Sequence, residues 1–151
     1  MVARLVRLIL CLLPLWLAAC TTGALLPPQP AYEGGIPAAD PLQGSAAQAL
    51  LERAVQAREA GDHAQASRSL ERAMALAPDS SWLYREAALL RSAEGDDRSA
   101  EVMLQRALRL APADQPLYQA ELWDKLAEVR RSLGHEARAE AAQAQAAKLR
   151  H

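Results

Sequence analysis

The 151-residue sequence lacks phenylalanine, has few β-branched residues, and is only 4% aromatic. No window alternates apolar and polar residues for long enough to predict a β-strand. Alanine, leucine and arginine are abundant instead, and such a composition favours helices. We therefore expect an all-α protein, and the length allows one modest domain.

The sequence also lacks the residue patterns that carry most catalysis and metal binding. Its two cysteines, Cys11 and Cys20, both lie near the N-terminus, so the remainder has no thiol for a disulfide, a metal site or a nucleophile. The histidines His63, His135 and His151 form no H-E-x-x-H pattern, and the first two are interpreted as solvated residues at helix starts. No serine is paired with a plausible base. These absences predict a protein that is not an enzyme and needs no cofactor or metal.

An excess of positive charge is absent as well. The formal net charge is −1, and without Arg4 and Arg7 there remain 15 basic and 18 acidic side chains. A nucleic-acid-binding protein needs a basic stripe that displaces counterions from phosphates. The mixed, mildly acidic composition therefore argues against a nucleic-acid partner.

What is present begins with the parts of a secretory signal peptide. Met1–Arg7 carries two arginines, residues 8–17 are nearly continuously apolar, and small residues precede Cys20. The apolar run is too short to cross roughly 30 Å of hydrocarbon as a finished helix. Residues 17–20, Leu-Ala-Ala-Cys, resemble the lipobox of bacterial lipoproteins.

This resemblance implies that the signal peptide 1–19 is cleaved between Ala19 and Cys20. A diacylglyceryl group would be attached to the Cys20 sulfur, and the new amino group would be acylated, for example with palmitate. Since each buried acyl CH₂ contributes about 0.8 kcal/mol, two or three chains make the attachment effectively permanent. Thr21 and Thr22 replace the aspartate that typically retains such proteins in the inner membrane, which implies the periplasmic face of the outer membrane. An ordinary signal peptide and a signal-anchor helix are the alternatives.

Residues 20–44 differ from the rest in their proline and glycine content. Prolines lack an amide donor and disfavour helix in the residue before them, so we expect a disordered tether, partly in polyproline II conformation. Its span is about 75 Å when stretched and about 27 Å as a flexible coil. Docking of Leu25, Leu26 and Tyr32 on the following domain is the alternative to a solvated tether.

From residue 45 onwards the chain repeats itself with an offset of 34 residues. Eleven pairs are identical between 45–78 and 79–112: Glu52/Glu86, Ala54/Ala88, Gly61/Gly95, Asp62/Asp96, Ala66/Ala100, Leu70/Leu104, Arg72/Arg106, Ala73/Ala107, Leu76/Leu110, Ala77/Ala111 and Pro78/Pro112. A 34-residue unit of helix, Gly-Asp turn, helix and proline resembles the tetratricopeptide repeat (TPR). A third unit, about 116–150, matches after five extra residues around 113–118. The resemblance implies a right-handed superhelix of about three helix pairs over 45–151.

Capping residues set the expected helix boundaries. Ser45 with Gln48 forms a capping box, Asp62 caps the next helix, and the acidic pair Asp96-Asp97 is interpreted as capping too. One of residues 79–81 should cap the third helix, and the sixth should close the array with a polar outer face. The expected helices cover residues 45–60, 62–76, 79–94, 96–110, 116–133 and 135–150, with Gly61, Gly95 and Gly134 between the members of each pair.

The TPR resemblance also implies which side chains fill the interior. Small residues should lie where paired helices cross: Ala54, Ala66, Ala73, Ala88, Ala100 and Ala107. Larger apolar residues should fill the spaces between them: Leu50, Leu70, Leu76, Tyr84, Leu104 and Leu110.

In TPR proteins the first helix of each unit lines a concave surface that binds partners. This register places there Gln48, Leu51, Val55, Arg58, Trp82, Arg85, Leu89, Ser92, Glu121, Asp124, Glu128 and Arg131. The groove should have an apolar, arginine-containing half and an acidic half, with exposed Trp82 and Arg85 as interface anchors. Alternatively, Trp82 packs on the neighbouring unit and Arg85 pairs with Asp124 or Glu128. Leu51 and Val55 stand where chaperone-binding carboxylate clamps need Lys and Asn.

The order of lipid anchor, tether and small repeat domain resembles the TPR-type lipoproteins that activate bifunctional penicillin-binding proteins. The resemblance implies a periplasmic protein–protein interaction scaffold whose partner is a peptidoglycan synthase. The alternative is a pilotin-like lipoprotein that assists assembly of a pilus or a secretion system.

Overall fold

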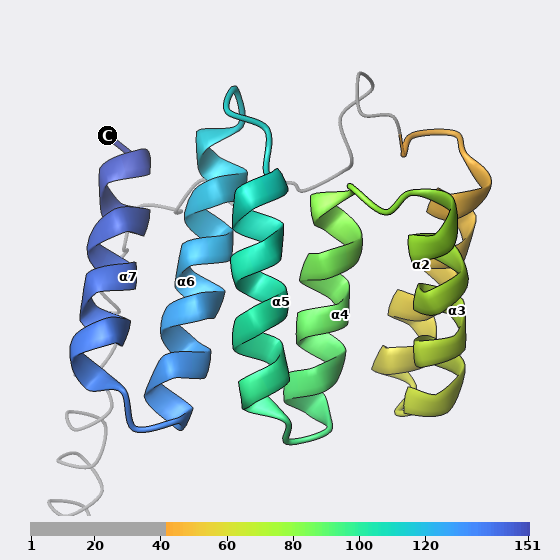
Figure 1. Cartoon of the computed structure of the whole chain (residues 1–151), viewed down its shortest axis with the longest axis horizontal. Coiled ribbons are helices and arrows are strands. Elements are labelled where there is room, and N and C mark those ends of the chain that lie inside the picture. The colour runs from red at the N-terminus through yellow and green to blue at the C-terminus, as the bar shows by residue number, and fades with distance from the viewer. Residues whose placement is uncertain (1–41) are drawn as a thin grey trace, which may run out of the picture. The chain divides into compact units, whose positions relative to one another are not determined.

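The computed structural model describes residues 42–151, and every regular element among them is a helix. The helices are α2 (Ala46–Glu59), α3 (His63–Leu76), α4 (Ser81–Ala93), α5 (Asp97–Leu110), α6 (Pro116–Ser132) and α7 (Glu136–Leu149). Figure 1 shows α4, α5, α6 and α7 side by side, with α2 and α3 packed together beyond α4, and consecutive helices run in opposite directions. The expected all-α fold of three helix pairs is confirmed. The predicted signal peptide, Cys20 and most of the predicted tether lie outside the described residues.

One turn closes all three helix pairs. After α2, the Gly61 N–H donates to the Arg58 carbonyl (2.9 Å) and the Asp62 N–H to the Ala57 carbonyl (2.8 Å), which is a Schellman motif. Gly61 has φ of 77°, a left-handed conformation that a Cβ would strain. The Asp62 carboxylate then accepts the Gln65 N–H (2.9 Å) and caps α3. A turn that ends one helix and begins the next within two residues forces the pair to pack closely.

The loops between pairs are built differently. α4 begins after Ser80, whose hydroxyl makes no capping hydrogen bond. α6 begins at Pro116, as expected, and the Gln119 side chain donates to the Pro112 carbonyl (2.7 Å). Asp97 was expected to cap α5 with Asp96, but only Asp96 does so, by accepting the Ser99 N–H (3.1 Å).

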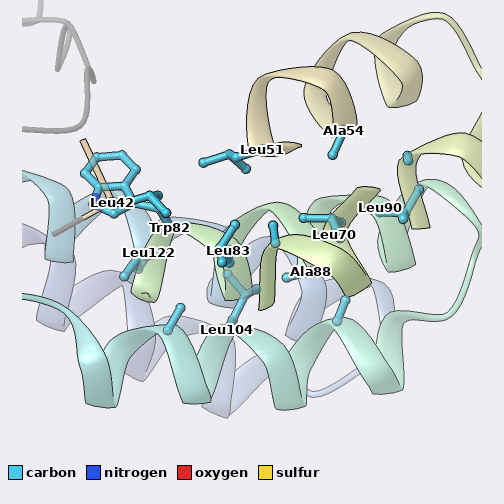
Figure 2. Packing of buried hydrophobic residues seen from close by; sticks show 14 of the residues in the cluster. Leu42, Leu51, Ala54, Leu70, Trp82, Leu83, Ala88, Leu90, Leu104 and Leu122 are labelled. Atoms are coloured by element: carbon cyan, nitrogen blue, oxygen red, sulfur yellow. The ribbon is translucent and has the colours of Figure 1, made fainter. Parts of the chain in front are cut away.

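The expected interior is largely confirmed. All six alanines predicted at helix crossings are buried, as are Leu70 and Leu104. Figure 2 shows Ala54, Ala88, Leu70 and Leu104 within this packing. The prediction for Leu76 is wrong: this side chain is 60% exposed, because it is the last residue of α3 and extends beyond the packed crossing.

The sixth helix packs as a cap. Ala139 and Ala142 form a small buried cluster with Ala127 of α6, and Trp123 packs against it. The remaining positions of α7 are mostly exposed and polar. With only alanine on its buried face, α7 can lie close to α6 while the outer face meets solvent.

The N-terminal boundary of the packed domain precedes the predicted one. Leu42, assigned to the tether by its proline-rich surroundings, is only 1% exposed and belongs to the main core cluster (Figure 2). The Ser45 N–H and hydroxyl both donate to the Leu42 carbonyl, at 3.1 and 2.6 Å. Leu42 therefore belongs to the packed domain and not to the tether.

Candidate functional site

A groove of about 470 Å³ lies between α2 and α4, and we call it the α2/α4 groove. Its residues recur at helical spacing on one face of each helix, so both helices present a stripe to the same hollow. Of the predicted site residues, it gathers Leu51, Val55, Arg58, Trp82, Arg85 and Leu89. Gln48, Glu52, Gln56, Glu59 and Glu86 complete the lining.

A smaller hollow of about 170 Å³, the α4/α6 hollow, follows along the array. Leu89 lines both spaces, and the predicted Glu128 reaches the second one, where its carboxylate accepts from Lys125 Nζ (3.0 Å). Asp124 and Arg131 line neither. Asp124 forms an ion pair with Arg150 just after α7, and Arg131 is exposed near the end of α6.

The two groove arginines are engaged in ion pairs. Arg58 Nε lies 2.5 Å from Glu86 Oε1, linking α2 to α4. Arg85 Nε and Nη2 lie 2.8 and 2.5 Å from Glu121 Oε1, linking α4 to α6. The expectation that Arg85 pairs with Asp124 or Glu128 is therefore wrong. The actual partner, Glu121, precedes Asp124 by about one helical turn and Glu128 by about two.

Glu86 is a buried acid that the sequence analysis did not single out. It is 2% exposed, and burial raises its pKa, while the hydrogen bond and the charge of Arg58 act in the opposite direction. Removing a charge from water is costly unless a partner compensates it. The only signal in the sequence was that Glu86 is identical to Glu52 at the equivalent repeat position. Since Glu52 is exposed, this identity could not predict the burial of Glu86.

Trp82 is not an exposed anchor. It is 3% exposed and stacks on Tyr118 of α6, with ring centroids 4.0 Å apart and an angle of 16° between the planes. The Arg85 guanidinium lies 5.9 Å from the Trp82 ring centroid. The alternative that Trp82 packs on the neighbouring unit is confirmed, and its edge forms part of the groove wall.

A polar bridge closes the α4/α6 side. The hydroxyls of Ser92 and Ser132 donate to the two oxygens of Asp97, at 2.7 and 2.5 Å, so one carboxylate joins α4, α5 and α6. Arg130 Nε adds a contact of 2.8 Å to Glu101 Oε1 between α6 and α5. These residues were not predicted as partners, because their contacts depend on how the units pack.

What remains available for binding is an apolar surface with an acidic border. Both exposed acids of the α2/α4 groove are engaged: Arg58 Nη2 also lies 3.7 Å from Glu59 Oε1. Glu52 accepts a hydrogen bond from the neutral Gln48 side chain (2.9 Å). The unneutralised charge in the groove lining therefore comes from Glu52. Leu89 is partly exposed and lines both hollows. An apolar side chain that is bordered by polar residues is suited to act as an interface anchor.

Within residues 42–151, no group of three His, Cys, Asp or Glu side chains is placed to hold a metal ion. In the same part of the chain, none of the helices combines the length and the apolar character needed to cross a membrane.

Comparison with known proteins places this geometry in a family. The profile of the tetratricopeptide repeat matches residues 57–122. The solved structure of the globular C-terminal domain of P. aeruginosa LpoP matches with 36% sequence identity and a TM-score of 0.62. The match covers 66% of this chain and 93% of that domain. The search of curated proteins produced no match. The chain therefore belongs to the tetratricopeptide repeat family and is a relative of the C-terminal domain of LpoP.

Proposed function

We propose that this protein is a lipid-anchored periplasmic scaffold that recruits or activates a peptidoglycan synthase of the penicillin-binding protein class. Cys20 carries the lipid after cleavage behind Ala19, and the anchor lies in the outer membrane. The repeat domain holds the partner at the α2/α4 groove. Catalysis belongs to the partner, and this chain contributes binding.

The match to the C-terminal domain of LpoP is the observation that carries the proposal. It covers 93% of that domain at 36% identity. In this chain the matching domain follows a predicted leader, lipobox and tether. The TPR-type lipoprotein activators, which the sequence resembles, have the same order of segments.

Affinity purification of the bound partner tests whether it is a peptidoglycan synthase. The full chain carries a C-terminal affinity tag and is purified from detergent-solubilised membranes of its own host. We expect the captured partner to be labelled covalently by fluorescent penicillin, which marks penicillin-binding proteins. Recovery of pilus or secretion subunits without a penicillin-labelled protein would overturn the synthase and favour the pilotin-like alternative.

The groove is tested with the same charge substitution at a partly exposed apolar residue inside it and an exposed apolar residue outside it. Leu89→Asp places a charge in the apolar wall of the groove, and we expect the affinity for the captured synthase to fall by roughly thirtyfold or more, as for an interface hot spot. Val102→Asp makes the same change on α5, at a side chain that is 57% exposed and lines neither hollow. Equal affinities of the two variants would contradict the groove.

The anchor is tested separately from the partner. Cys20→Ser removes the sulfur that would carry the diacylglyceryl group, so we expect the protein to leave the membrane fraction. The groove should still bind the synthase in detergent, since it lies in the repeat domain. A Cys20→Ser protein that stays in the membrane fraction would contradict lipid attachment at this residue.

A further inference from the structure

A third hollow, of about 560 Å³, lies at the end of the array where the loops between units meet. We call it the loop-end pocket. It lies between the start of α2, the α3–α4 loop and the end of α5, and it shares no lining residue with the α2/α4 groove. Its apolar lining consists of Leu42, Ala46, Ala47, Leu76, Ala77, Pro78, Leu110 and Pro112.

Two features of this pocket are unexplained by the repeat fold. The Leu76 side chain is 60% exposed at its wall, although the equivalent repeat position was expected in the interior. Ser80, also in the lining, has a buried hydroxyl without a hydrogen-bond partner and does not cap α4. Because an unpaired buried hydroxyl is costly, the site fits a ligand with both apolar side chains and backbone polar groups.

The chain itself delivers such a ligand to the pocket. Leu42, the first described residue, is part of the pocket wall, so the preceding segment is covalently joined to the chain at the site. Within 27–41 the only aliphatic side chain larger than alanine, prolines aside, is Ile36, with Tyr32 four residues earlier. The chain from Ile36 to Leu42 comprises six residue steps, which reach about 20 Å when fully extended.

We propose that the loop-end pocket binds the chain's own segment 32–41, with Ile36 against Leu76 and a backbone group of the segment on the Ser80 hydroxyl. Tethering favours this occupant, since a short linker gives an effective concentration on the order of millimolar. A weak apolar contact is then sufficient for docking. The docked segment shortens the free part of the tether to the residues before Tyr32.

Photocrosslinking in the full chain tests this contact directly. The photoreactive amino acid p-benzoylphenylalanine replaces Ile36, and the illuminated protein is digested and analysed by mass spectrometry. We expect a crosslink within one chain to peptides that contain Leu76 or Leu110. A crosslink between two chains would assign the pocket to a second copy, and no crosslink to these peptides would exclude docking. Both results would overturn the proposal.

Hydrogen exchange gives a second measurement that needs no unnatural residue. Leu76→Asp charges the exposed pocket wall without opening the core, and we expect amide exchange in residues 33–40 to accelerate roughly tenfold. Val102→Asp is the matched control and should leave this exchange unchanged, because Val102 is similarly exposed but lies outside the pocket. Equal exchange in the two variants and the unmutated chain would overturn docking.

Discussion

The two junctions between repeat units are built on one sequence pattern but packed differently. The first junction joins the α2–α3 pair to the α4–α5 pair, and the second joins the α4–α5 pair to the α6–α7 pair. At the first junction the larger groove lies between α2 and α4, and one ion pair, Arg58–Glu86, bridges these helices. At the second, α5 packs on α6 more extensively than α3 packs on α4. The Trp82–Tyr118 stack, the Arg85–Glu121 pair and the Asp97 bridge tie this second junction together.

The comparison indicates where the array is rigid and where it is adaptable. In a repeat protein each unit contacts only its neighbours, so stability is close to a sum of unit and junction terms. A junction with several ties should open less often than one with a single tie. The first unit, α2 and α3, is therefore the part expected to separate first and to adjust to a partner in the α2/α4 groove.

We expect the largest difference between the two junctions when a leucine at each one is replaced by alanine and the unfolding free energies are compared. Leu122 of α6 is fully buried, and we expect Leu122→Ala to cost about 4 kcal/mol of unfolding free energy. Leu51 of α2 borders the open groove, where the surroundings can relax, so Leu51→Ala should cost about 2 kcal/mol. Urea unfolding followed by circular dichroism measures both. Equal costs would contradict the difference between the junctions.

The ion pairs should give the opposite order. Arg58→Ala leaves Glu86 buried without its partner, and we expect a cost of about 3 kcal/mol. Arg85→Ala leaves Glu121, which is 23% exposed and can be hydrated, so about 1 kcal/mol is expected. The same urea titrations decide the order. If Arg85→Ala lowered the unfolding free energy more than Arg58→Ala does, burial of the remaining acid would not determine the cost of losing the ion pair.

Local features of the fold could be predicted from the sequence. The caps Ser45, Asp62 and Asp96 and the turn at Gly61 depend on residues within one helical turn, so their signals are contained in short stretches of sequence. The 34-residue offset then transferred each assignment to the next unit. The six residues of the α2/α4 groove followed from this register.

Contacts between units could not be predicted in the same way. The five extra residues before α6 change its position along α4, so Arg85 meets Glu121, and neither Asp124 nor Glu128. The burial of Trp82 could not be predicted either, because tryptophan is common both at interfaces and in protein cores. Leu42 was assigned to the tether because prolines surround it, although its own side chain is apolar enough to pack.

The smallest expected effect concerns the pH dependence of the first junction. Burial raises the pKa of Glu86 above 4.5, so the folded state holds its proton more tightly than the unfolded state does. Between the unfolded and folded pKa values the folded protein binds more protons, and stability from this group falls as pH rises through that window. Glu86→Gln keeps an oxygen that can accept from Arg58 but cannot ionise. The unfolding free energy of the unmutated protein minus that of the variant should therefore decline slightly as pH rises from 4.5 and then level off. Glu52→Gln at the equivalent exposed position is the matched control, and an equal decline there would contradict burial as the cause.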